Sequence, residues 1–489
     1  MPTRTRSLTP TEGALDVPAV TAGLAERFRV DAHTRRPVRV TSLDTFDRRL
    51  AKAGLTLQLR TSAGKDELVL VDDEQELSAP AGGLRLPAMS AALPPGPLLD
   101  RLAPVLEMRA LMDLGVQRRL LRLVELRNTD DKLVVRVTVD EPDQVRVTPL
   151  RGYDSDGRAA LKVLGGLGLR EAAAGGGAPE EPEDQPPGPD ARATTYVAHV
   201  LRGFLETMSA NLPGLLDDVD TEFLHDFRVS VRRTRSTLKL ARPAMPADLR
   251  ETWEPRFKWL GDLTTPVRDL DVYRLDLPTM AGWLVAADPS DLRALGEHLQ
   301  RRRTAERRRL VRGLRSARYQ RLVGEWADRL TALADERPAE SGTADDVARS
   351  AIHRAGRRVT KDGTAVHADS PASDLHGLRK RCKELRYALE VFSPLLDKGD
   401  RKALVADLKV LQDVLGRFQD TEVQRAKLRD FAEEMMRDGT PTEAVLALGE
   451  LIGHLDAAQD DARREFDEAF GRFARPANRR RLAHLAGRS

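Results

Sequence analysis

The segment HDFRVSVRRTRSTLKL at 225–240 is repeated, with substitutions, as HGLRKRCKELRYALEV at 376–391. Matching positions are 151 residues apart, and the same offset continues without a gap to align 260–272 with 411–423. A repeat of this length indicates that one structural unit was duplicated within the chain. We therefore expect the two copies to form related halves of one feature.

Helical spacing separates each copy into two stripes. At 100° per residue, the basic positions of a copy fall within an arc of about 80° beside an apolar stripe. The basic rows are His225, Arg228, Arg232, Arg235 and Lys239 in the first copy, and His376, Arg379, Lys383 and Arg386 in the second. The apolar stripes are Leu224, Phe227, Val231 and Leu238, and Leu375, Leu378, Cys382, Leu385 and Leu389. Positive groups at i+3 and i+4 repel unless an anion lies across them, so the rows predict an anion site.

A second interpretation of the rows is an ordinary solvated helix face. His225 and His376 are also compatible with helix capping or interhelical packing, and His225–Asp226 with a metal-dependent phosphohydrolase.

The stretch 301–321 contains ten arginines, of which Arg308, Arg312 and Arg315 share a face with Arg301. That third row suits a surface helix or a binding surface equally. We expect the acids Asp269, Asp271 and Asp420 to cap helices or pair with the basic rows rather than bind metal, and Tyr319 and Tyr387 to pack between helices.

Composition limits the classes of function. The chain has 489 residues, which suggests two to four domains, and 79 basic against 76 acidic residues. Because the net charge is only +3, a polyanion site must come from local segregation of charge. The single cysteine, Cys382, excludes an internal disulfide and a cysteine-rich zinc site. Without a long apolar run or a signal-like N-terminus, we expect a cytoplasmic protein with no membrane association.

A change of pattern divides the chain. Residues 171–194 are rich in Gly, Pro, Ala and acidic side chains, which predicts a flexible linker. Before it, paired strand patterns at 55–60 with 67–72, and at 120–127 with 132–139, predict antiparallel hairpins. After it, the periodicity is helical. We therefore predict an α+β chain with an antiparallel β-barrel-like domain over 1–170 and an all-α domain over 195–489. That helical domain would comprise two pseudo-twofold related bundles, at about 195–335 and 345–475.

The duplicated His-x-x-Arg-x-x-x-(Arg/Lys)-x-x-Arg pattern resembles the CHAD family of helical domains. Arg-Lys-x-x-Lys-x-x-Arg-Tyr at 379–387, Arg-Asp-x-Asp-Val at 268–272 and Leu-Arg-Ser-Ala-Arg-Tyr at 314–319 support that resemblance. CHAD domains bind inorganic polyphosphate, so the resemblance implies this partner and association with polyphosphate granules. Rows of guanidinium and ammonium groups suit a linear chain of phosphates.

The N-terminal part is similar to the CYTH family of triphosphate tunnel enzymes, through the hairpin TSLDTFDRRLAKAGLTLQLR at 41–60. That family holds a divalent metal with Glu-x-Glu strands, which this chain lacks at its start and at 145–150. Since a hard cation requires carboxylate oxygens, we expect no catalysis, no metal and no cofactor. Arg60, Arg109 and Arg136 remain as candidate anion contacts.

The sequence therefore predicts a non-enzymatic polyphosphate-binding protein. The candidate contacts are His225, Arg228, Arg232, Arg233, Arg235, Lys239, Arg308, Arg312, Arg315, His376, Arg379, Lys380, Lys383 and Arg386. One alternative is a metal-dependent triphosphatase or polyphosphatase of the CYTH type in the N-terminal domain. Another is nucleic-acid binding by the Arg-rich helices, which the scarcity of aromatic residues for base stacking makes the weaker candidate.

Overall fold

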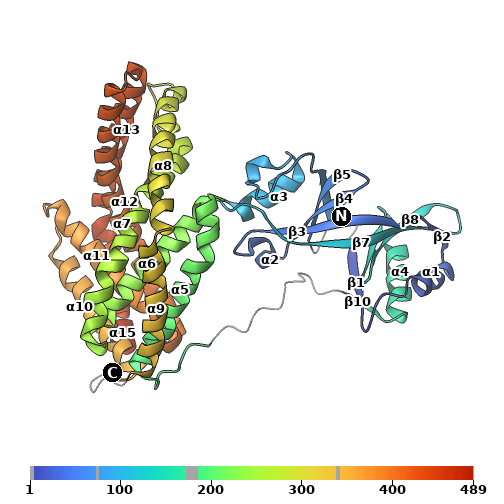
Figure 1. Cartoon of the computed structure of the whole chain (residues 1–489), viewed down its shortest axis with the longest axis horizontal. Coiled ribbons are helices and arrows are strands. Elements are labelled where there is room, and N and C mark those ends of the chain that lie inside the picture. The colour runs from blue at the N-terminus through green and yellow to red at the C-terminus, as the bar shows by residue number, and fades with distance from the viewer. Residues whose placement is uncertain (1–4, 73–75, 172–184, 337–341, 488–489) are drawn as a thin grey trace. The chain divides into compact units, whose positions relative to one another are not determined.

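The computed structural model describes residues 5–72, 76–171, 185–336 and 342–487. Most of the predicted linker, 172–184, lies outside the described residues. The chain separates into two compact units, Met1–Glu183 and Asp184–Ser489, which are drawn in Figure 1. Within the described ranges, no helix combines the length and the apolar character that a membrane span requires.

The N-terminal unit is built on a curled antiparallel sheet, a half-barrel. Its strands are β1 Arg6–Pro10, β2 Arg29–Ala32, β3 Arg36–Asp44, β4 Thr56–Ser62, β5 Lys65–Val71, β6 Glu76–Pro80, β7 Met112–Arg127, β8 Leu133–Glu141, β9 Gln144–Pro149 and β10 Leu169–Glu171. They are ordered β10-β1-β9-β8-β7-β3-β4-β5-β6, and β2 also pairs with β7. Arg146 on β9 hydrogen-bonds Glu76 on the distant edge strand β6, which shows how strongly the sheet curls. The predicted hairpins and the β-barrel-like fold are confirmed.

Two apolar cores lie against this sheet. One contains Val135, Val137 and Val139 of β8 and packs against the helices α1, Val17–Ala25, and α4, Asp154–Gly166. The other joins the β4–β5 hairpin to α2, Arg49–Lys52, and α3, Pro97–Leu106. The alternation of apolar and polar residues along the strands therefore leaves polar side chains on the opposite face.

The described residues of the C-terminal unit fold into helices joined by short connections. The first copy of the repeat contains α5 Ala193–Asp217, α6 Thr221–Leu240, α7 Ala247–Ala281, α8 Arg293–Leu314 and α9 Ala317–Asp335. The second contains α10 Ala344–Ala365, α11 Ala372–Val391, α12 Lys398–Arg437, α13 Thr442–Arg464, α14 Phe466–Phe473 and α15 Pro476–Leu485. The first three helices of one copy begin 151 residues before those of the other, so the sequence repeat is also a structural one.

The two copies also share a core. The C-terminal part of α7 and the N-terminal part of α8 pack with α12 and α13 through residues such as Met280, Leu299, Phe431 and Leu451. In Figure 1, α8 and α13 run side by side at one end of this unit. The predicted pair of related bundles is therefore one fused helical domain.

Candidate functional site

Helices α6 and α11 form where the sequence placed them. The carboxylate of Asp220 caps α6 by accepting hydrogen bonds from the backbone N–H groups of Glu222 and Phe223, at 2.9 and 3.2 Å. Both predicted apolar stripes are buried. The lone cysteine, Cys382, belongs to the buried stripe of α11, and burial raises the pKa of its thiol to about 12. Burial of one stripe on each helix fixes which side chains remain at the edge.

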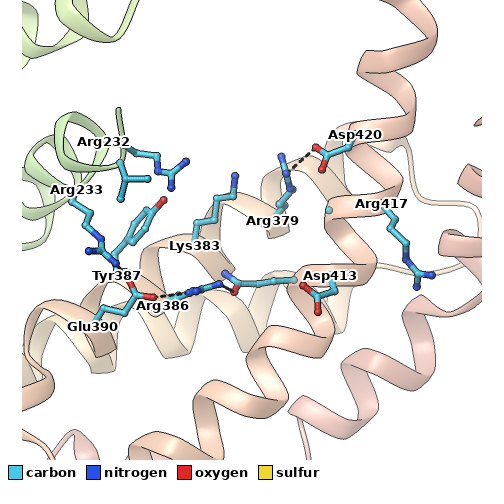
Figure 2. A pocket seen from close by; sticks show the side chains of 13 residues that line it. Arg232, Arg233, Arg379, Lys383, Arg386, Tyr387, Glu390, Asp413, Arg417 and Asp420 are labelled. Carbon is cyan, nitrogen blue, oxygen red and sulfur yellow. Dashed lines mark hydrogen bonds and ion pairs between the residues drawn. The ribbon is translucent and has the colours of Figure 1, made fainter. Parts of the chain in front are cut away.

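A pocket of about 450 Å³ opens where α6, α11 and α12 meet. We call it the first basic pocket. It is lined by six basic side chains, three acidic ones and a few uncharged residues: Val229, Arg232, Arg233, Arg379, Lys383, Arg386, Tyr387, Glu390, Gln412, Asp413, Gly416, Arg417 and Asp420. Figure 2 shows Arg232 and Arg233 of α6 facing Arg379, Lys383 and Arg386 of α11. Side chains from both copies of the repeat thus converge on one site.

Several cations of this pocket already have acidic partners. Glu390 accepts a hydrogen bond from Nε of Arg386 at 2.7 Å and one from Arg233 at 3.3 Å. Arg379 donates to the carboxylate of Asp420 at 2.9 Å, an interaction that Figure 2 marks. These pairs hold the guanidinium groups in place at the pocket wall.

Arg232 and Lys383 differ from their neighbours, because neither pairs with a carboxylate among the described residues. The guanidinium of Arg232 lies over the ring of Tyr387, 5.9 Å from its centroid. Burial and the nearby charges of Arg379 and Arg232 together lower the pKa of Lys383 to about 8, against a weaker opposing effect of Asp420. The pocket therefore contains positive charge that the protein leaves uncompensated.

Two predicted contacts point elsewhere. Arg228 donates to the hydroxyls of Thr264 and Thr265 on α7, at 3.1 and 2.8 Å. Burial lowers its pKa, although Asp269 opposes this effect. Arg235 also approaches α7, because the Arg235 guanidinium lies 3.4 Å from the position that a Cβ atom would take at Gly261 of that helix. Both side chains therefore connect α6 to α7 and do not line the first basic pocket.

The two histidines occupy equivalent positions outside this pocket. His225 is half-buried, and its burial together with the charge of Arg268 lowers its pKa. In the second copy, Gln419 takes the position of Arg268, and its side chain is hydrogen-bonded to Nδ1 of His376. The histidines therefore face the helix that follows them in each copy.

The Arg-rich helix α8 separates into two sets. Arg303 is buried and donates to Asp218 at 2.7 and 2.8 Å, and it also pairs with Asp271. Arg308, Arg312 and Arg315 are exposed and line neither the first basic pocket nor the second one described below. The expected pairing of Asp420 with a basic row is confirmed through Arg379, whereas Asp271 pairs with Arg303, which belongs to none of the predicted rows.

The remaining predicted cations, Lys239 and Lys380, line a second basic pocket of about 480 Å³ among α6, α10 and α11. Lys383 and Tyr387 line both pockets, so the two are contiguous. Tyr387, expected to be a packing residue, is thus part of the pocket wall. The sequence prediction omitted Gln412, Asp413 and Arg417 of α12, although all three lie within the repeated segment 411–423.

The polar face of the N-terminal sheet contains a group of paired charges. Arg119 donates to Asp143 at 2.6 Å and lies 3.4 Å from Asp140, while Glu76 pairs with Arg146 and lies 3.5 Å from Arg60. Burial and the charge of Arg146 lower the pKa of Arg60 to about 10. Arg119 and Arg146, which the sequence analysis did not single out, therefore belong to this group together with the predicted Arg60.

The other two predicted N-terminal cations lie apart from that group. Arg109 is buried, 3.5 Å from Asp47 and over the ring of Phe46. Arg136 is exposed and lies 3.5 Å from Glu125. Among the described residues, one set of side chains has ligand atoms close enough to share a metal ion: Asp31 of β2, His33 just after β2, and Glu125 of β7. Arg136 beside Glu125 supplies a positive charge that opposes a cation there.

Residues 199–429 match the family model of the CHAD domain. The crystal structure of the CHAD domain from the plant Ricinus communis is 25% identical, with 64% of this chain and 97% of that chain covered and a TM-score of 0.48. PptA from Streptomyces chartreusis is 21% identical, with 57% and 99% covered and a TM-score of 0.45.

A third structure aligns with 35% of this chain. It is the putative adenylyl cyclase HpAC1 from Hippeastrum, described as having a dominant triphosphatase activity. It is 13% identical to this chain, 91% of its own length is covered and the TM-score is 0.26. No curated protein matches the chain.

The family match covers both copies of the duplicated basic helix, which was the basis of the predicted resemblance. The N-terminal unit has the curled antiparallel sheet expected of a CYTH-like fold. Residues 199–429 of this chain are a CHAD domain.

Proposed function

We propose that this protein binds inorganic polyphosphate in the first basic pocket without catalysing its hydrolysis. One observation carries the proposal. Arg232 of α6 and Lys383 of α11 bring positive charge from both copies of the repeat into one pocket, where no carboxylate pairs with either of them among the described residues. Like charges held together in a half-buried site favour an anion between them.

The chemistry of the lining suits phosphate oxygens. Guanidinium groups donate two parallel hydrogen bonds to such oxygens, and ammonium groups provide a compact charge. Arg233, Arg379 and Arg386 are already oriented by Glu390 and Asp420, so that binding requires little reordering of these side chains. An inorganic chain has neither bases nor sugars, so a pocket of charges with one aromatic ring provides the contacts it needs. Binding to polyphosphate granules would be the cellular consequence.

The charges on the N-terminal sheet support the non-enzymatic part of the proposal. Phosphoryl transfer assisted by a divalent cation requires carboxylate oxygens that are available to the metal. Here Glu76 is paired with Arg146, and Asp140 lies 3.4 Å from Arg119. These arginines therefore pair with carboxylates of this group that would otherwise be available to a metal ion.

The test is a calorimetric titration of the full chain with long-chain polyphosphate. Arg232→Glu combined with Lys383→Glu is expected to weaken binding by more than about tenfold, because two cations that line the pocket become anions. Arg293→Glu combined with Arg429→Glu is the matched control. Both residues are exposed, lie outside the two basic pockets and undergo the same change of charge. Equal affinity of the two variants would remove this pocket from the function.

A further inference from the structure

The second basic pocket has a stronger excess of positive charge than the first. Eight basic residues and one acidic residue, Glu384, line it. Glu384 is engaged by Arg358 and Arg381, at 3.5 and 3.3 Å. By contrast, no carboxylate pairs with the exposed Lys239, Arg242 or Lys380 among the described residues. Most of this charge is therefore uncompensated.

The internal repeat provides a comparison within the same molecule. A third pocket, of about 440 Å³, lies at the equivalent place in the other copy, between α5, α6 and the end of α11. Six cations of the second basic pocket have counterparts, 151 residues away, that line this third pocket, and none of those counterparts is basic. Examples are Lys239 with Glu390, Arg354 with Gly203, and Lys380 with Val229.

This difference shows that the duplicated fold does not by itself require a basic lining. The same backbone position forms a pocket of mixed character in one copy and a strongly cationic one in the other. Clustered like charges are destabilising unless an anion compensates them. The second basic pocket therefore has a feature that folding alone does not explain.

The two sides of the first basic pocket also differ. Toward the third pocket, the shared lining residues are Val229, Arg233 and Glu390, and the last two form an ion pair at 3.3 Å. Toward the second basic pocket, the shared residues are Lys383 and Tyr387. Lys383 has no carboxylate partner among the described residues, so the positive lining continues on this side.

We infer that a linear polyanion occupying the first basic pocket continues past Lys383 and Tyr387 into the second, so that affinity increases with the length of the phosphate chain. This inference rests on the proposed function and specifies its substrate class as chains long enough to span both pockets. A short anion would occupy the first pocket and gain little from Lys239, Arg242 and Lys380.

Titrations with triphosphate and with long-chain polyphosphate test the inference. The variant is Lys239→Glu, Arg242→Glu and Lys380→Glu, and the control is Arg293→Glu, Arg429→Glu and Arg480→Glu. All six residues are exposed, and the control residues lie outside both basic pockets. The variant is expected to lose about tenfold in affinity for the long chain and to keep its triphosphate affinity within about twofold. The control is expected to retain both affinities.

The outcomes separate the two proposals. If the wild-type chain binds long polyphosphate and the second-pocket variant binds it equally well, this inference is overturned and the proposed function stands. An equal loss in the control, or an equal loss of triphosphate affinity in the variant, would also overturn it, because net charge would then explain the effect. If the wild-type chain binds neither ligand, the proposed function fails. All proteins carry the same N-terminal domain, so triphosphate bound there does not distinguish them, and thermal unfolding checks that each variant is folded.

Discussion

At the scale of single residues, Lys383 is the residue on which the proposed polyphosphate site depends most. It lines both basic pockets, and its pKa is lowered to about 8 by burial and by the neighbouring Arg379 and Arg232. A bound phosphate would stabilise the ammonium form, so binding should be coupled to the uptake of a proton.

The first prediction follows from the sign of that shift. Below pH 8 the ammonium of Lys383 is charged, and above pH 8 it is increasingly neutral. Polyphosphate affinity should therefore fall about tenfold between pH 7 and pH 9.5, which corresponds to the loss of one charged hydrogen bond. Titrations at fixed ionic strength measure this. Lys383→Arg keeps its charge over the range and should give a nearly flat profile, whereas an equally steep profile in that variant would contradict the assignment.

Glu390 gives a second prediction at this scale. Its carboxylate lies within the first basic pocket and pairs with both Arg233 and Arg386, where a phosphate would compete with it. Glu390→Gln removes a negative charge close to the ligand and should increase affinity roughly threefold to tenfold. Titration of this variant beside Glu297→Gln, an exposed acid outside the pockets, measures the effect. Weaker binding in Glu390→Gln would mean that the carboxylate orients the arginines more than it competes.

At the scale of secondary-structure elements, buried ion pairs connect helices that apolar packing brings together. Arg303 of α8 joins Asp218, which directly follows α5, to Asp271 of α7. The buried Asp407 of α12 also connects elements, because the exposed Arg472 and Arg475 and the buried Asn478 of the C-terminal segment all donate to it. These contacts explain why part of the arginine content is structural.

The third prediction concerns this helix junction. Arg303→Ala would leave Asp271 buried without its partner and should reduce the free energy of unfolding by about 3 kcal/mol. Arg309→Ala, an exposed change on the same helix, should alter it by about 0.5 kcal/mol or less. Urea denaturation of both variants provides the comparison. Similar stabilities would show that the Arg303 interactions make no net contribution.

At the scale of the whole molecule, the two units combine a CHAD domain with a sheet on which Asp140 and Glu76 are paired with arginines. The fourth prediction is that the full chain releases no phosphate from triphosphate above background when Mg²⁺ or Mn²⁺ is supplied. A malachite green assay measures this, and Arg119→Ala should not create activity. Metal-dependent release by the wild-type chain would instead favour the triphosphatase alternative.

The sequence by itself determined the duplicated helices, their buried stripes and the division into a sheet and a helical domain. These features depend on local periodicity and on the repeat, which are independent of distant contacts. Helical spacing also identified Arg232, Arg379, Lys383 and Arg386 as members of one basic surface. All four line the first basic pocket.

Only the tertiary structure decided which basic side chains remain available to bind an anion. Arg228 and Arg235 belong to the same row as Arg232, yet they turn toward α7. Similarly, Arg303 is buried with acids that lie 32 and 85 residues away, whereas Arg308 on the same helix is exposed. The physical reason is that compensation of a charge depends on which carboxylate packs beside it, and such partners come from helices that are remote in the sequence.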